Sequence, residues 1–143
     1  MSLGIHSRIH ETVRVLDLEG RLVVGPEATQ LREAVKGLAE SGERNVILNL
    51  ASVEMIDSTG LGALVMSFTT LRNAGGMLKL LNLNRRNIEL LVLTKLTAVF
   101  EIFTDEQDAV NSFFPGREVK RFDILNFVRR IKEEEEQEDA AAG

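Results

Sequence analysis

Hydrophobic and polar residues alternate near the start of the chain. Over Val13–Leu18 the apolar side chains recur at nearly every second position, which is the period of a strand with one buried face. Glu19-Gly20 fits a tight turn, because glycine adopts the positive φ that such turns need. Leu22–Val24 then fits the returning strand of a hairpin, and Ile5–Ile9 predicts an additional edge strand.

The period changes after Pro26, where apolar residues recur every three to four positions. Proline suits the first turn of a helix, because the N–H that it lacks has no partner there. Strands and helices then alternate: a helix from Pro26 that ends before Ser41-Gly42, strand 46–50, helix 58–73, strand 77–81, helix 86–95, strand 99–103, and a short helix opened by a capping box at Thr104–Gln107. This order predicts one α/β domain with a mixed sheet of four to five strands and about four helices packed on it.

A further amphipathic helix is predicted beyond Pro115-Gly116. Its apolar stripe has helical spacing, Asp123 is a suitable N-cap, and the stripe consists of Ile124, Phe127, Val128 and Ile131. The stripe can pack onto the domain, which we favour, or against a second copy in a homodimer. We expect a domain over residues 1–114, a helical extension over 115–134 and a disordered acidic tail over 135–143.

Composition and charge exclude several classes of function. The chain has no cysteine and only two histidines, so we expect no metal site, no cofactor and no thiol or imidazole catalysis. Residues 132–139 have a net charge of −5, equal to that of the whole chain, so the remainder is neutral and nucleic acid is not an expected partner. Neither a signal peptide nor an apolar run of membrane-spanning length is present, which favours a cytoplasmic protein without a membrane partner.

Candidate chemistry concentrates where a buried strand leads into the second helix, at Asp57-Ser58-Thr59-Gly60-Leu61-Gly62. The first N–H groups of that helix lack partners and carry partial positive charge, which favours a phosphate on Ser58. From the residues alone, Ser58 is most simply a plain N-cap. Asp57 can cap the helix or position the hydroxyl, and Thr59 is a second acceptor or, as we favour, a first-turn surface residue. The two glycines disfavour a helix, so they indicate close packing or docking. Gly60-x-Gly62 lacks the third glycine of a dinucleotide loop, and no histidine follows position 10 to serve a nucleophile elbow.

These residues resemble a known family. The motifs are Asn49-Leu50, Ile56-Asp57-Ser58-Thr59-Gly60-Leu61-Gly62, Gly75-Gly76, Leu90–Leu96 and Val99–Phe103. Over residues 13–113 they are similar to the STAS domain of bacterial anti-sigma factor antagonists. The resemblance implies that Ser58 is phosphorylated by a partner anti-sigma factor that is also a serine kinase. It further implies that the unphosphorylated form binds this partner and that a metal-dependent protein phosphatase reverses the modification.

The resemblance also implies a partner-binding surface and leaves alternatives open. The expected surface consists of Asp57, Ser58, Thr59, Gly60 and Leu61 together with Val24 and Gly25. Members often have G-E-L-D where this chain has Gly20-Arg21-Leu22-Val23. A non-enzymatic switch is the leading hypothesis. The alternatives are a scaffold subunit of a signalling or lipid-transport assembly that is not phosphorylated, and a small-molecule or nucleotide-binding domain.

Overall fold

The computed structural model describes residues 3–142, so residues 1, 2 and 143, at the ends of the predicted domain and tail, lie outside the described part. The strands are β1 (Gly4–His10), β2 (Val13–Leu22), β3 (Asn45–Ile56), β4 (Met77–Leu81) and β5 (Ile102–Phe103). The helices are α1 (Pro26–Glu40), α2 (Ser58–Asn73), α3 (Arg85–Leu93), the 3-10 turn η1 (Leu96–Ala98), α4 (Glu106–Asn111) and α5 (Ile124–Ala142). The predicted mixed α/β domain is confirmed.

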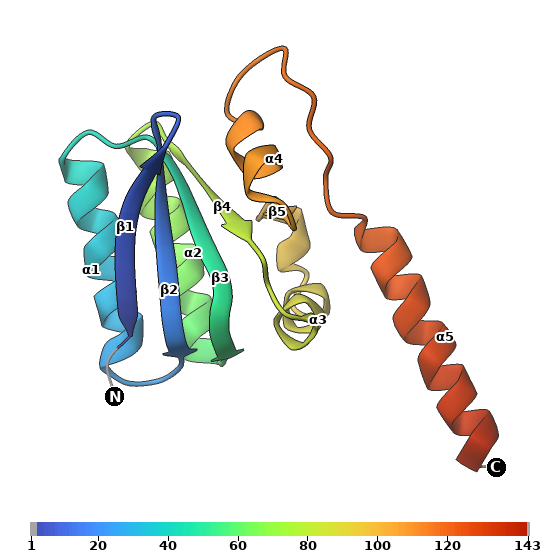
Figure 1. Cartoon of the computed structure of the whole chain (residues 1–143). Coiled ribbons are helices and arrows are strands. Elements are labelled where there is room, and N and C mark those ends of the chain that lie inside the picture. The colour runs from blue at the N-terminus through green and yellow to red at the C-terminus, as the bar shows by residue number, and fades with distance from the viewer. Residues whose placement is uncertain (1–2, 143) are drawn as a thin grey trace.

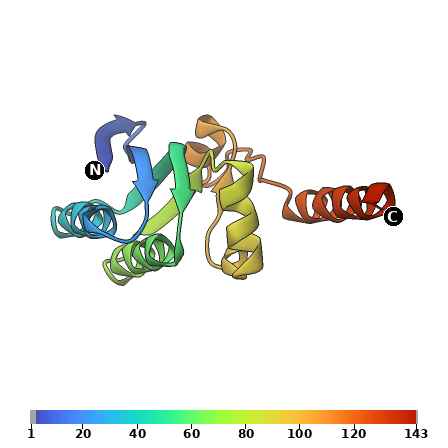
Figure 2. The same ribbon diagram turned by 90° about the horizontal axis from the view of Figure 1, so that it is seen from below.

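The five strands form one sheet in the order β1-β2-β3-β4-β5 (Figure 1). β1 pairs antiparallel with β2, and every later pair is parallel. Each parallel connection moves one strand along in the same direction, so right-handed crossovers place their helices on the same face. Figure 2 shows α1 and α2 on that face and α4 on the opposite one. The carboxyl ends of β2 and β3 therefore open toward the beginnings of α1 and α2.

The N-terminal hairpin lies one strand earlier than the sequence predicted. β2 runs without a turn from Val13 to Leu22, and the tight turn joins β1 to β2 at Glu11 and Thr12, whose φ angles are 50° and 72°. Gly20 has a φ of 119° inside β2, next to an irregularity in its pairing with β3. The predicted turn at Glu19-Gly20 is therefore wrong, because this glycine serves a bulge in a continuous strand.

Two apolar clusters cover the two faces of the sheet. The larger lies under α1, α2 and α3 and includes Leu31, Leu64 and Leu91, each fully buried. The smaller lies under α4, where Val110 packs near Phe103. Hydrophobic burial on both faces holds the central strands rigidly, so the loops at their ends have a fixed support.

The end of the domain differs locally from the prediction. Val99 has helical dihedrals after η1, so the strand expected over residues 99–103 shortens to β5. The side chain of Asp105 accepts the hydrogen bond from the N–H of Asp108 and caps α4, so the capping box predicted at Thr104 is wrong by one residue.

The last helix, α5, projects from the body of the domain (Figure 1). Its predicted N-cap is confirmed, since the Asp123 carboxylate accepts from the N–H of Asn126 at 2.9 Å. Of the predicted stripe, Ile124 and Phe127 pack against the larger core cluster, as favoured from the sequence, whereas Val128 and Ile131 line a groove beside α3. The helix continues to Ala142, whereas we predicted disorder from Glu135. Glutamate and alanine are strong helix formers, which favours this continuation over the unfavourable charge at its end.

Candidate functional site

The candidate site lies where β3 ends and α2 begins, and Asp57 organises it. One carboxylate oxygen of Asp57 accepts from the N–H of Gly60 at 2.8 Å, and the other accepts from the N–H of Val24 at 2.9 Å. The N–H of Asp57 itself donates to the carbonyl of Leu22. Asp57 therefore caps α2 and also fixes the loop between β2 and α1 beside it.

Backbone donors set the electrostatics of the Asp57 carboxylate. The hydrogen bond from Gly60 has the largest effect and, together with that from Val24, holds the pKa of this carboxyl below its usual range, although burial raises it. The carboxylate thus stays charged at neutral pH. The cap in this structure is Asp57, so the interpretation of Ser58 as the N-cap is wrong.

Ser58 is the first residue of α2, and its side chain is exposed. Within residues 3–142 its hydroxyl makes no hydrogen bond, so the group is available to another molecule. Thr59 is exposed beside it. Because Asp57 supplies the cap, neither hydroxyl is needed to hold the helix start.

The two glycines of α2 differ in their surroundings. A Cβ atom on Gly60 would lie 1.9 Å from the carbonyl oxygen of Leu22, so glycine is required where α2 crosses the end of β2. A Cβ on Gly62 would meet nothing within 4 Å. Gly60 is therefore needed for packing within the chain, whereas no contact within residues 3–142 requires glycine at the exposed position 62.

The predicted partner-binding residues divide by exposure. Val24 is 71% exposed, and Gly25 is exposed with a φ of 130° that favours glycine. Ser58 and Thr59 are exposed next to this loop. Asp57 is half-buried, whereas Gly60 and Leu61 are buried and shape the site from below.

One exposed apolar residue was missed by sequence reasoning. Met66 is 50% exposed on α2, at helical spacing from Thr59 and Gly62. It lies off the apolar stripe of Leu61, Leu64 and Phe68, and that offset was the available signal. We use the term Ser58 surface for the following exposed and uncharged set: Val24, Gly25, Ser58, Thr59, Gly62 and Met66.

Nowhere in residues 3–142 do three or more histidine, aspartate or glutamate side chains gather closely enough to hold a metal ion. Over the same residues, no helix combines the length and the apolar character required to cross a membrane.

Comparison with known proteins agrees with the fold. The sequence model of the STAS domain family matches residues 5–109 of this chain. The anti-sigma-B factor antagonist of Bacillus subtilis is 33% identical over 110 residues, which cover 77% of this chain and 99% of the relative. The protein of the same name from Staphylococcus epidermidis is 32% identical over 103 residues, or 71% of this chain and 85% of the relative.

Solved structures share the architecture. An anti-sigma factor antagonist from Mycobacterium paratuberculosis superposes with a TM-score of 0.68 at 20% identity, covering 77% of this chain and 92% of that one. The anti-sigma factor antagonist SpoIIAA in its unphosphorylated form gives a TM-score of 0.58 at 19% identity, covering 79% and 98%. At such identities the likeness concerns the fold, whereas the family match and the curated relatives carry the assignment. The chain belongs to the STAS domain family, and the two relatives described above are anti-sigma-B factor antagonists.

Proposed function

We propose that this protein is an anti-sigma factor antagonist that is switched by phosphorylation of Ser58. In the unphosphorylated state it binds an anti-sigma factor that is also a serine kinase, and it thereby regulates transcription indirectly. Phosphorylation by this partner releases it, and a metal-dependent phosphatase restores the binding form. The names of its curated relatives support the general role. Among the solved structures of similar fold is SpoIIAA in the phosphorylated form, and that phosphorylation is a property of SpoIIAA.

The observation that carries the proposal is the exposed and unbonded hydroxyl of Ser58 at the start of α2. A kinase can reach it, and its modification breaks no contact that holds the loop. A phosphate at this position lies at the N-terminal end of α2, where the partial positive charge of the helix favours a negative group. The helix start therefore accommodates the modified residue.

The release step follows from the character of the Ser58 surface. Val24 and Met66 offer apolar side chains to a partner, and Gly62 allows its backbone to approach closely. A phosphate adds nearly two negative charges among these uncharged side chains, next to the charged Asp57 carboxylate. A partner that covered the patch would have to remove water from that charge, which weakens binding.

The test uses the full chain, ATP and the purified anti-sigma factor from the same organism. Mass spectrometry should find one added phosphoryl group, absent in Ser58→Ala and present in Thr59→Ala. Calorimetry should find that Ser58→Asp binds the anti-sigma factor much more weakly than wild type, while Ser58→Ala binds normally. Equal binding by wild type and Ser58→Asp would refute the switch and favour an unphosphorylated scaffold. Phosphorylation that moved to Thr59 would refute the assignment of the acceptor.

A further inference from the structure

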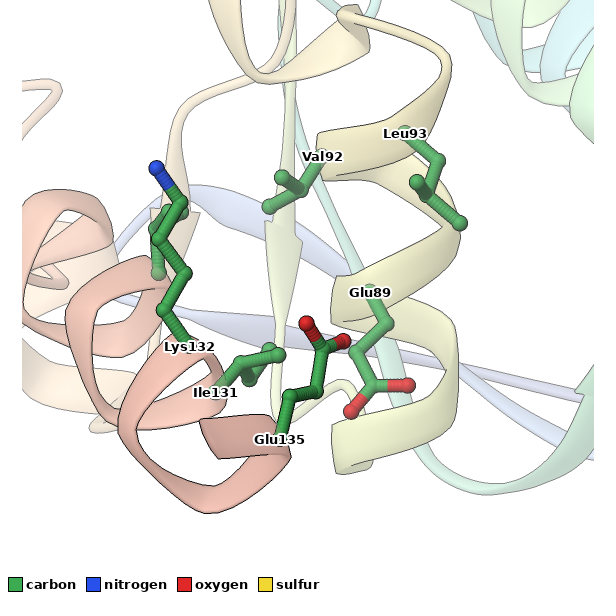
Figure 3. Close-up of a pocket in the computed structure, with 7 residues that line it drawn as sticks. Glu89, Val92, Leu93, Ile131, Lys132 and Glu135 are labelled. Carbon is green, nitrogen blue, oxygen red and sulfur yellow. The ribbon is translucent and has the colours of Figure 1, made fainter. Parts of the chain in front are cut away.

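A groove runs between α3 and α5, on a different element from the Ser58 surface. It has a volume of about 250 Å³. The residues that line it are Glu89, Val92 and Leu93 of α3 and Val128, Ile131, Lys132 and Glu135 of α5 (Figure 3). The start of α5 is held against the body by Phe127, and an Arg85–Glu134 ion pair ties its middle to α3. The groove therefore lies between two helices that are joined by these contacts.

The lining of the groove is apolar and incompletely covered. Val92, Val128 and Ile131 are half-buried, whereas Leu93 is 80% exposed at the edge of α3. Leu125, one turn before Val128 on α5, is 84% exposed. Apolar side chains that stay partly or largely exposed on two neighbouring helices are typical of an interaction site.

The charges around the groove select the partner. Glu89 and Glu135 point into the gap from opposite helices, while the ammonium group of Lys132 points away from them (Figure 3). Glu89 pairs with Arg85, but Glu135 has no ion pair within residues 3–142. Beyond it, α5 continues with the acidic residues Glu136, Glu138 and Asp139. One end of the groove therefore presents carboxylates that a cationic partner can neutralise.

We infer that the groove between α3 and α5 binds an amphipathic helix of another protein, with apolar side chains on one face and lysine or arginine beside them. Apolar anchors of that helix pack on Val92, Val128 and Ile131, and its cations face Glu89 and Glu135. The volume lies below the range of about 300–1,000 Å³ usual for small-molecule sites, which favours side chains of a protein partner. A second copy would bring the same net charge of −5, so it is disfavoured relative to a basic partner.

The inference does not depend on the proposed function, and model peptides can test it. The probes are a synthetic leucine–lysine peptide with leucines at helical i, i+3, i+4 spacing and the same peptide with glutamate in place of lysine. Fluorescence anisotropy with the full chain should detect binding of the lysine peptide and much weaker binding of the glutamate peptide. Leu93→Gln should lower the affinity about tenfold, since it removes an apolar contact, and Glu135→Gln about threefold.

Two matched variants serve as controls. Val24→Gln removes an exposed apolar side chain on the Ser58 surface, and Glu138→Gln removes a carboxylate of α5 that does not line the groove. Both should bind the lysine peptide as wild type does, and circular dichroism should show that all four variants are folded. Equal weakening by Glu138→Gln and Glu135→Gln, or equal binding of both peptides, would overturn the inference. It would also be overturned by a dimer in light scattering that Leu93→Gln dissociates, because the occupant would then be a second copy.

Discussion

Replacing Gly60 and Gly62 by alanine compares two chemically identical changes made two residues apart on one helix. At Gly60 the new methyl group would lie 1.9 Å from the carbonyl oxygen of Leu22, whereas ordinary contacts begin at 3.4 Å. The backbone of α2 or β2 must therefore move by about 1.5 Å. At Gly62 the methyl group would meet nothing within 4 Å.

The expected changes in the free energy of unfolding have opposite signs. Overpacking at Gly60 costs about 3 kcal/mol, reduced by the roughly 1 kcal/mol that alanine gains over glycine in a helix, so the net loss is about 2 kcal/mol. Gly62→Ala has only the gain, up to about 1 kcal/mol. For a chain of 143 residues, 1 kcal/mol corresponds to about 3 °C in Tm, so we expect a fall of about 6 °C and a rise of up to about 3 °C.

Urea and thermal unfolding followed by far-ultraviolet circular dichroism measure both changes, since the chain lacks tryptophan and tyrosine. Equal stability of the Gly60→Ala and Gly62→Ala variants would refute the close crossing of α2 over β2. The same pair tests the Ser58 surface by a second measurement. Gly62→Ala should weaken binding of the anti-sigma factor about tenfold while it stabilises the fold, because the methyl group intrudes only on a docked partner.

Three further predictions concern single side chains. Asp57→Ala should lower the free energy of unfolding by about 1 kcal/mol in urea titrations, because it removes the cap of α2. Hydrogen bonds from Arg8, and then His10, lower the pKa of Glu106 from 4.5 to about 2. The resulting stabilisation is complete above pH 4.5 and is lost as the pH falls toward 2, so Glu106→Gln should flatten the pH dependence of Tm in this window. In urea titrations, Lys79→Met should change the free energy of unfolding by less than about 1 kcal/mol, since its partner Glu101 also pairs with Arg121. Lys79→Ala should lower the free energy of unfolding by about 2 kcal/mol or more, because it opens a void.

The alternation of buried strands and amphipathic helices was predictable because each helix must cover the sheet with one face. The N-terminal hairpin was misplaced because the local turn signals are misleading. Glu11 and Thr12 adopt positive φ although neither is a usual turn residue. Gly20, in contrast, is a usual turn residue but lies in a bulge of β2. Pairing of β1 with β2 along seven residue positions overrides the local preference of the turn.

The candidate site was predicted from the sequence, but the structural roles of its residues required coordinates. Asp57 and Ser58 are both good N-caps in adjacent positions, so the pattern alone cannot say which one closes the helix. The distance to Val24, 33 residues earlier in the chain, settles it, because only the residue at position 57 reaches that N–H. Similarly, the close approach of Gly60 to Leu22 is a tertiary contact, which residue spacing within the helix cannot predict.

The division of roles between neighbouring residues explains how the proposed switch would operate without unfolding its support. Asp57 makes the cap and the bond to Val24, and Gly60 permits the close crossing, so the fold is held beside Ser58 and not through it. A charged group added to the Ser58 hydroxyl then changes the free energy of docking much more than that of folding. Had Ser58 been the cap, the same modification would have removed a hydrogen bond that α2 needs, and the signal would have been coupled to partial loss of the helix.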